Sequence, residues 1–200
     1  MDSKNINDIF LPFINEIDEL PPPQEYRRRT AVETPPELQV ELDRTREMRE
    51  GEFRSWLIKN KPKEALMTSI ETSTAVGVPD IFCCYQGYSS WIECKVTITG
   101  PGRIRGTQYS YLKKLIAAGG NAKIVVQGIA TQTYKPASIS IYDARQIVSL
   151  PVGMFKVVGK ELVFPPDLKP KYKWMYSNAK NVTIDELYLH LLLDTKEFEE

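Results

Sequence analysis

Histidine is almost absent from this chain of 200 residues, since His190 is the only one and stands among leucines. The three cysteines, Cys83, Cys84 and Cys94, are odd in number, and two of them are adjacent. Such a set is a poor disulfide framework and indicates reduced thiols. With one histidine, a zinc cluster of cysteine and histidine ligands is not plausible either.

Long hydrophobic runs are also missing. No stretch approaches the roughly 18 apolar residues of a membrane-spanning helix, and the N-terminus lacks a basic segment followed by an apolar one. We therefore expect a soluble protein with no membrane contact, located in the cytoplasm.

The chain has no excess of either charge, because Lys+Arg and Asp+Glu are equal at 26 each. Net charge therefore argues neither for nor against a nucleic-acid partner, and any such surface must come from local clustering. The hydrophobic fraction of 42% is enough for one core.

Three parts are expected along the chain: an N-terminal helix and proline-rich arm (1–37), a core (38–130), and a C-terminal extension packed on that core (131–200). Hydrophobic periodicity predicts a helix over 38–59, a helix over 107–118 and a terminal helix over 183–194. Strands and a hairpin are predicted over 65–71, 81–85, 91–97, 122–130, 138–143 and 155–164. This order is typical of an α/β protein with a mixed central β-sheet flanked by helices.

Asp80 follows a proline directly before an apolar strand, which places its carboxylate at the mouth of that strand. A Pro-Asp pair is also common in turns without any function.

Glu93 and Lys95 lie two residues apart in the next strand, so their side chains share one face. They could be an exposed cross-strand pair. The neighbouring Trp91, Ile92 and Cys94, however, indicate a largely buried strand, where charge is costly unless it is paired or bound to a metal.

Two helices add candidates. Glu52 flanks the apolar stripe of the first helix and can approach the site from the side, with Glu50 on the other edge as the fallback. Both are ordinary surface acids when taken alone. Gln108 shares the apolar stripe of the following helix, where it either hydrogen-bonds to the site or ends the core harmlessly.

These residue types suit a hard divalent cation. Mg²⁺ takes one or two carboxylates and keeps several waters, which Asp80, Glu93 and the backbone carbonyl of Cys94 can supply. Such an ion polarises a phosphoryl oxygen and lowers the pKa of a bound water. Lys95 would then position that water or neutralise developing charge, which predicts phosphodiester hydrolysis.

The ordered set resembles the PD-(D/E)xK nuclease superfamily, with its restriction-endonuclease-like core. The matching elements are Glu52, the Pro-Asp ending at Asp80, the Glu-x-Lys of Glu93 and Lys95, and a helix with Gln108 before an apolar strand. Within roughly 45–130 the chain is similar to VRR-NUC and Holliday-junction-resolvase-like nucleases, including small phage-encoded ones.

This resemblance implies an enzyme that depends on Mg²⁺ or Mn²⁺ and cleaves DNA in recombination or repair, leaving a 5′-phosphate. It implies metal ligation by Asp80 and Glu93 with help from Glu52, a catalytic Lys95, and an organising role for Gln108. Resolvase-like members often act as homodimers on branched DNA, and a phage-encoded one would work in the host cytoplasm.

Basic residues near the motif are candidates for DNA contacts. Arg103 and Arg105 lie in a Gly/Pro loop close in sequence to Lys95, and Lys113 lies on the following helix. Each could equally be a solvated surface charge. Two further functions stay open: a restriction-type nuclease or exonuclease of the same superfamily, and a non-catalytic nucleic-acid-binding or scaffold protein that retains the fold.

Overall fold

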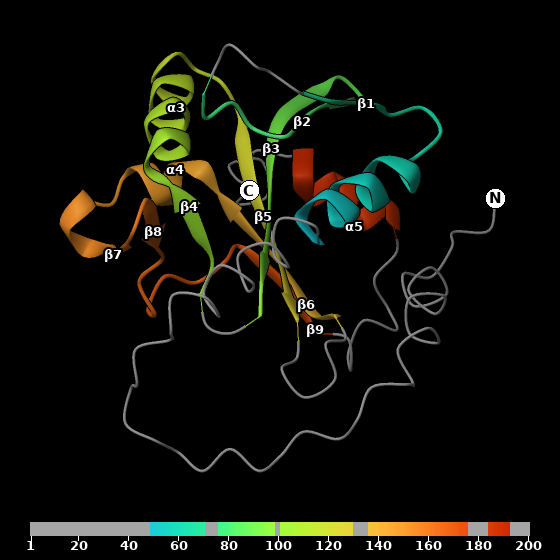
Figure 1. The fold of residues 1–200 in the computed structure, drawn as a ribbon. Helices are drawn as coiled ribbons and strands as arrows, with labels where there is room; N and C mark the ends of the chain where they lie inside the picture. The colour runs from blue at the N-terminus through green and yellow to red at the C-terminus, as the bar shows by residue number, and fades with distance from the viewer. Residues whose placement is uncertain (1–48, 71–75, 99–100, 130–135, 176–183, 193–200) are drawn as a thin grey trace, which may run out of the picture.

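The computed structural model describes residues 49–70, 76–98, 101–129, 136–175 and 184–192. Its centre is a six-stranded sheet in the order β1-β2-β3-β5-β6-β9 (Figure 1). The strands are β1 (Leu66–Ser69), β2 (Ile81–Tyr85), β3 (Tyr88–Thr97), β5 (Ala122–Ile129), β6 (Pro136–Asp143) and β9 (Tyr172–Met175). Only β3 and β5 run parallel within this sheet. It is therefore a mixed sheet, as predicted.

A small antiparallel sheet and several helices cover the large one. The small sheet has the order β4-β8-β7 and consists of β4 (Arg103–Arg105), β7 (Lys156–Val158) and β8 (Glu161–Val163). The helices are 49–59, α3 (Gly106–Ala117), α4 (Ala144–Val148), the 3-10 turn Val152–Met154, and α5 (Ile184–Leu192). Figure 1 shows α3, α4 and the small sheet on one side of the large sheet, with 49–59 and α5 on the other.

The alternation of side chains along β3 divides the interior into two cores. Cys94 and Val96 face the first core, which includes Trp56 of the helix 49–59 and Leu187 of α5. The helix 49–59 and α5 are also joined directly, because the Tyr188 hydroxyl donates a hydrogen bond to the Leu57 carbonyl.

The second core lies under α3 and α4, where Leu112 and Ile147 pack with Ile124 of β5. Glu93 and Lys95 project to this side of the sheet, and they are only 1% and 8% exposed. Both faces of β3 are therefore covered, and the two charges of the motif are inside the protein.

The β2–β3 hairpin turns at Gln86 and Gly87, which have φ values of 51° and 84°. Two successive residues with positive φ are typical of a tight hairpin turn that matches the twist of the flanking strands. The turn is thus shorter than the sequence suggested, and β3 begins at Tyr88.

Most predicted elements are confirmed, including the C-terminal hairpin β7–β8 and the terminal helix α5. The interpretation of the Gly/Pro segment as a flexible loop is wrong for Arg103–Arg105, which form β4 and pair with β8. Sequence analysis also missed α4 and β9. The predicted N-terminal helix and arm, and the start of the helix predicted from Leu38, lie outside the described residues. In the parts of the chain that are described, no helix is long and apolar enough to cross a membrane.

Candidate active site

The site lies where β3 extends beyond its neighbour β2. Pairing with β2 ends opposite Ile92, so the backbone of β3 after that residue has an open edge. The N–H of Cys94 donates to Asp80 Oδ2 at 2.8 Å, and the N–H of Val96 donates to Glu50 Oε1 at 3.3 Å. Two carboxylates thus satisfy backbone donors that a neighbouring strand would otherwise pair. Because β2 ends before this part of β3, Asp80 and Glu50 can reach these backbone donors.

Lys95 lies between two carboxylates. Its Nζ is 2.8 Å from Glu93 Oε1 and 3.2 Å from Glu50 Oε2. Burial alone would lower the pKa of Lys95, but Glu93 and Glu50 outweigh it and raise the pKa above the usual lysine value. Lys95 therefore carries its positive charge throughout the neutral pH range.

Glu93 is the most deeply buried acid of this group. Its Oε1 accepts from Lys95 and also from the side-chain amide of Gln108. Its Oε2 is buried and has no hydrogen-bond partner among the described residues. Burial raises the pKa of Glu93 to about 8, against the opposing effect of Lys95. An unpartnered carboxylate oxygen at this depth is costly unless something binds it.

Gln108 connects this acid to the start of a helix. Its Oε1 accepts from the backbone N–H of Arg105 at 2.8 Å, which caps the N-terminus of α3, while its Nε2 donates to Glu93. Both the oxygen and the nitrogen of the Gln108 side-chain amide are therefore hydrogen-bonded. The sequence left open whether Gln108 hydrogen-bonds to the site or only ends the apolar core. In the structure it hydrogen-bonds to Glu93 of the site.

The structure does not bring Glu52 to this group, because its side chain is exposed on the helix 49–59. Glu50, the fallback, lies there instead. One residue advances about 100° around a helix, so Glu50 lies on the Leu57 edge of the apolar stripe and Glu52 on the Trp56 edge. Only the Leu57 edge faces the end of β3. The choice of Glu52 is thus corrected by the rotation of this helix.

Arg54 is a member of the group that sequence analysis missed. Its Nη1 lies 3.6 Å from Asp80 Oδ1. It follows Glu50 by four residues, so the two side chains share one face of the helix. The four-residue spacing from Glu50 could have indicated Arg54 in the sequence, but only if Glu50 had been preferred to Glu52 as the acid of the site.

The predicted DNA-contacting residues lie on β4 and α3. Arg103 Nη1 pairs with Glu161 Oε2 of β8 at 2.9 Å, which stabilises the small sheet. Arg105 and Lys113 are exposed at the start and on the surface of α3. Their role in binding stays a prediction.

The donor set fits a hard cation only in part. Within the described residues, no three Asp, Glu, His or Cys side chains are placed to hold a metal ion. Two carboxylates suffice for Mg²⁺ when waters and a carbonyl complete its shell. The N–H and C=O of one strand residue point to the same side, so the Cys94 carbonyl lies on the open edge beside Asp80. The unpartnered Glu93 Oε2 is a further oxygen of the kind that such an ion takes.

No protein-family model and no curated protein matches this sequence. Among solved structures, the chain is similar to Hjc of Archaeoglobus fulgidus, a Holliday junction resolvase from an archaeal hyperthermophile. The match has a TM-score of 0.38 and 13% sequence identity, and it covers 65% of this chain and 89% of that one.

Proposed function

We propose that this protein is a metal-dependent nuclease that hydrolyses phosphodiester bonds in DNA. The observation that supports this most is the buried Glu93 carboxylate, whose Oε2 lacks a partner while Lys95 and Gln108 hold its other oxygen. If the buried Glu93–Lys95 pair served only the fold, apolar residues of similar volume at both positions would serve it as well or better. The acid is better explained as a ligand.

Asp80, Glu93 and the Cys94 carbonyl would hold a Mg²⁺ or Mn²⁺ ion. When bound, such an ion would polarise a phosphoryl oxygen of the substrate and lower the pKa of a bound water. Asp80 Oδ2 already accepts a hydrogen bond from the Cys94 N–H, so the position of the Asp80 carboxylate does not depend on the ion. Such pre-organisation reduces the reorganisation that catalysis requires.

Lys95 acts in this proposal as a cation and not as a general base. Because Glu93 and Glu50 raise its pKa, it keeps its proton at neutral pH. A protonated amine can stabilise negative charge that develops on the phosphoryl oxygens or donate a proton to the leaving oxygen. Glu50 holds it in place from the second side, at 3.2 Å.

The test is a cleavage assay on a four-way junction, a flap and a linear duplex, each with Mg²⁺, Mn²⁺ or EDTA. We expect metal-dependent cleavage that Asp80→Ala and Lys95→Ala abolish, with the branched DNA favoured because the motif order resembles junction resolvases. Glu64→Ala and Lys156→Ala are matched controls, since both residues are exposed and outside the site. The proposal fails if no DNA is cut, or if Asp80→Ala cuts as well as the wild type.

A non-catalytic nucleic-acid-binding protein is the second candidate. It is favoured by the Asp80–Arg54 and Glu50–Lys95 ion pairs, which neutralise much of the site without an ion. Titration calorimetry with Mg²⁺ separates the two. No heat of binding at millimolar Mg²⁺, together with retained DNA binding, would favour this second function.

A further inference from the structure

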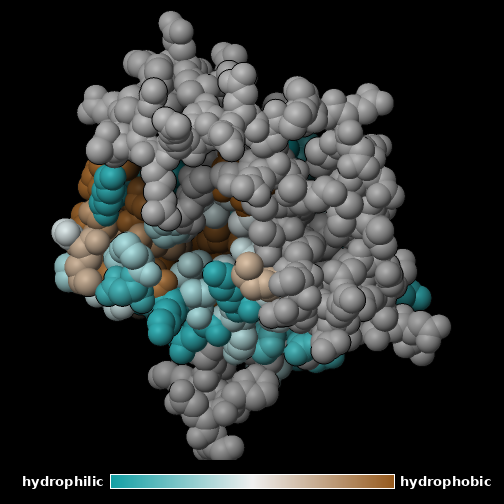
Figure 2. All heavy atoms as spheres, turned by 90° about the horizontal axis from the view of Figure 1, so that it is seen from below, coloured by the Kyte–Doolittle hydropathy of each residue, from teal (hydrophilic) through white to brown (hydrophobic). Residues whose placement is uncertain are grey.

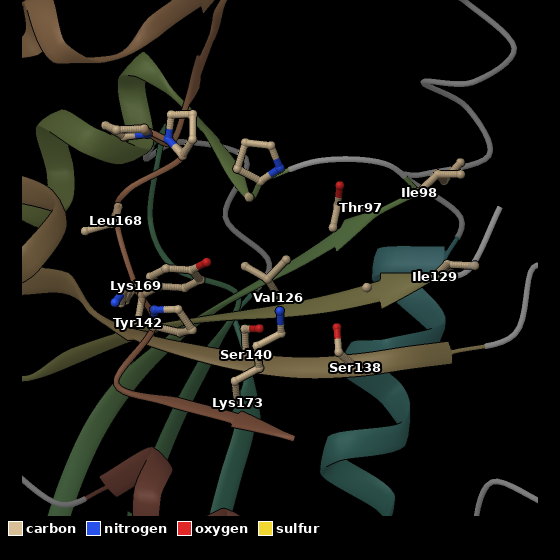
Figure 3. Close-up of a pocket in the computed structure, with 16 residues that line it drawn as sticks. Thr97, Ile98, Val126, Ile129, Ser138, Ser140, Tyr142, Leu168, Lys169 and Lys173 are labelled. Carbon is tan, nitrogen blue, oxygen red and sulfur yellow. The ribbon is translucent and has the colours of Figure 1, made fainter. Parts of the chain in front are cut away.

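A cavity of about 690 Å³ opens on the face of the large sheet that carries Glu93 and Lys95 (Figure 3). Its floor consists of the ends of β3, β5 and β6, and the proline-containing segment 165–170 forms a wall. In the view of Figure 2, this lower end of the molecule has a hollow with hydrophobic residues inside and hydrophilic residues beside it. Cavities of roughly 300–1,000 Å³ are typical of sites for small organic molecules.

The cavity begins directly beside Lys95. Across the sheet, Lys95 is in register with Val126, Val126 with Ser140, and Ser140 with Lys173. Residues opposite each other on paired strands project to the same face, and the last three all line the cavity. With strands about 4.8 Å apart, Lys173 lies three strands, or roughly 14 Å, from Lys95. One row of side chains thus connects the two places.

The next row of the floor has a glycine between two residues with hydroxyl groups. Thr97 is in register with Gly128, and Gly128 with Ser138. A Cβ at Gly128 would lie only 2.5 Å from Ser138 Oγ. The Ser138 hydroxyl therefore lies directly over Gly128, where a side chain would displace it, and Figure 3 shows the Thr97 and Ser138 hydroxyls on the cavity side of the sheet.

The lining combines cations, hydroxyls and flat apolar groups. Lys169 and Lys173 supply two amines, and both residues are exposed. Thr97, Ser138 and Ser140 supply hydroxyls. Apolar contact comes from Val126, Ile129, Leu168, Pro101, Pro165 and Pro166. No acidic side chain is among the described residues that line the cavity. This composition suits a ligand with a flat base and an anionic phosphate.

We infer that this cavity binds an unpaired nucleotide of the strand that is cut at the Glu93–Lys95 site. The inference rests on the proposed function and adds the kind of substrate. A base can enter a walled space with its edge toward hydroxyl groups only when no partner base occupies that edge. Lys169 and Lys173 would hold the phosphates next to it. The strand would run from Lys95 along the row to Lys173.

The experiment measures binding of the full-length protein to fluorescent oligonucleotides by anisotropy, at low salt and in EDTA so that nothing is cut. The probes are a short single-stranded DNA, an RNA of the same sequence and a blunt DNA duplex. We expect the wild type to bind a single strand more tightly than the duplex. We expect Lys169→Ala/Lys173→Ala to weaken single-strand binding about tenfold or more through loss of two phosphate contacts.

Two variants make this specific. Lys63→Ala/Lys156→Ala removes two exposed lysines away from the cavity, and it should bind as the wild type does. Ser138→Phe fills the cavity without changing the charge and should also weaken binding, provided its thermal melt shows a folded protein. Should Ser138→Phe not fold, the two lysine pairs decide the question alone. Equal effects of the two lysine pairs, or absent single-strand binding, would overturn the inference.

The binding and cleavage results are separable. A protein that binds single strands through the cavity but cuts nothing keeps the inference about the ligand and ends the proposed nuclease function. A protein that cuts DNA while Lys169→Ala/Lys173→Ala binds every probe as the wild type does keeps the nuclease function and ends the inference. The DNA and RNA probes distinguish which sugar the cavity accepts.

Discussion

Lys95 and Glu50, 45 residues apart in sequence, lie with Nζ 3.2 Å from Oε2. This contact joins the helix 49–59 to the open edge of β3, and Glu50 accepts there from the Val96 N–H as well. We predict that Glu50→Gln lowers the DNA cleavage rate about tenfold or more, a loss of about 1.4 kcal/mol in transition-state stabilisation. The reason is that the neutral amide of glutamine lacks the negative charge with which Glu50 attracts and positions the Lys95 ammonium.

Glu52→Gln is the matched control, since it makes the same chemical change two residues later on the same helix. Glu52 is exposed, so we expect its cleavage rate to stay within about twofold of the wild type. Single-turnover kinetics with both variants is the measurement. A larger loss in Glu52→Gln than in Glu50→Gln would mean that the helix 49–59 approaches the site with a different rotation.

Glu50 and Glu52 also show how much of the site could be predicted from the sequence. The strand with Glu93 and Lys95 was predictable because polar and apolar residues alternate there, and both faces are indeed covered. The acid of the helix was not predictable with certainty, because Glu50 and Glu52 flank the same apolar stripe on opposite edges. Helical periodicity gives the stripe but not which edge meets β3.

Other features were beyond reach for related reasons. Three residues, Arg103–Arg105, carry too short a pattern to indicate a strand, and β4 exists because β8 pairs with it. The five-residue α4 is shorter than the window in which periodicity is detectable. Gln108 was a candidate from its helix face, but its bond to Glu93 depends on how α3 packs over β3. Tertiary contacts decide each of these cases.

Gln108 offers a second test, because α4 contains a comparable glutamine. Gln146 Oε1 accepts from the Asp143 N–H at 3.1 Å, as Gln108 Oε1 accepts from the Arg105 N–H at 2.8 Å. We predict that Gln108→Ala and Gln146→Ala each cost about 0.5–2 kcal/mol in stability through loss of a cap. Only Gln108→Ala should also lower cleavage, because Glu93 loses a hydrogen-bond donor.

Urea denaturation and cleavage assays on the two variants provide the comparison. Gln146→Ala serves as the control for a general weakening of a helix start. If both variants lose activity to the same extent, the effect comes from stability and Gln108 has no special part in the site.

The pH dependence of stability tests the environment of Glu93. Burial raises the pKa of Glu93 to about 8 from a reference value of 4.5, so the folded protein holds this proton more tightly than the unfolded chain. Stability without metal should therefore fall as pH rises from about 5 to about 8 and level off above that range. Glu50, whose pKa burial also raises, acts in the same direction.

Thermal melts in EDTA across this pH range measure the effect. Glu93→Gln cannot lose a proton, so its melting temperature should fall less steeply, with the remaining slope due to Glu50. Identical slopes for the variant and the wild type would contradict the assignment of a raised pKa to Glu93.

The buried pair of Lys123 and Asp143 supports the fold outside the site. Lys123 Nζ lies 2.6 Å from Asp143 Oδ2, and the two are 1% and 3% exposed. Asp143 also accepts from the Arg145 N–H and so caps α4. We predict that Asp143→Ala destabilises the protein by about 3–5 kcal/mol, because it leaves the Lys123 ammonium buried without its carboxylate.

Lys123→Met/Asp143→Ala is the informative companion variant, since it removes both charges. It should recover a large part of the lost stability but not the part due to the cap, about 1 kcal/mol. Chemical denaturation of the wild type, the single and the double variant measures the coupling between the two residues. A double variant as unstable as Asp143→Ala would mean that the cap, and not the uncompensated lysine, accounts for the loss.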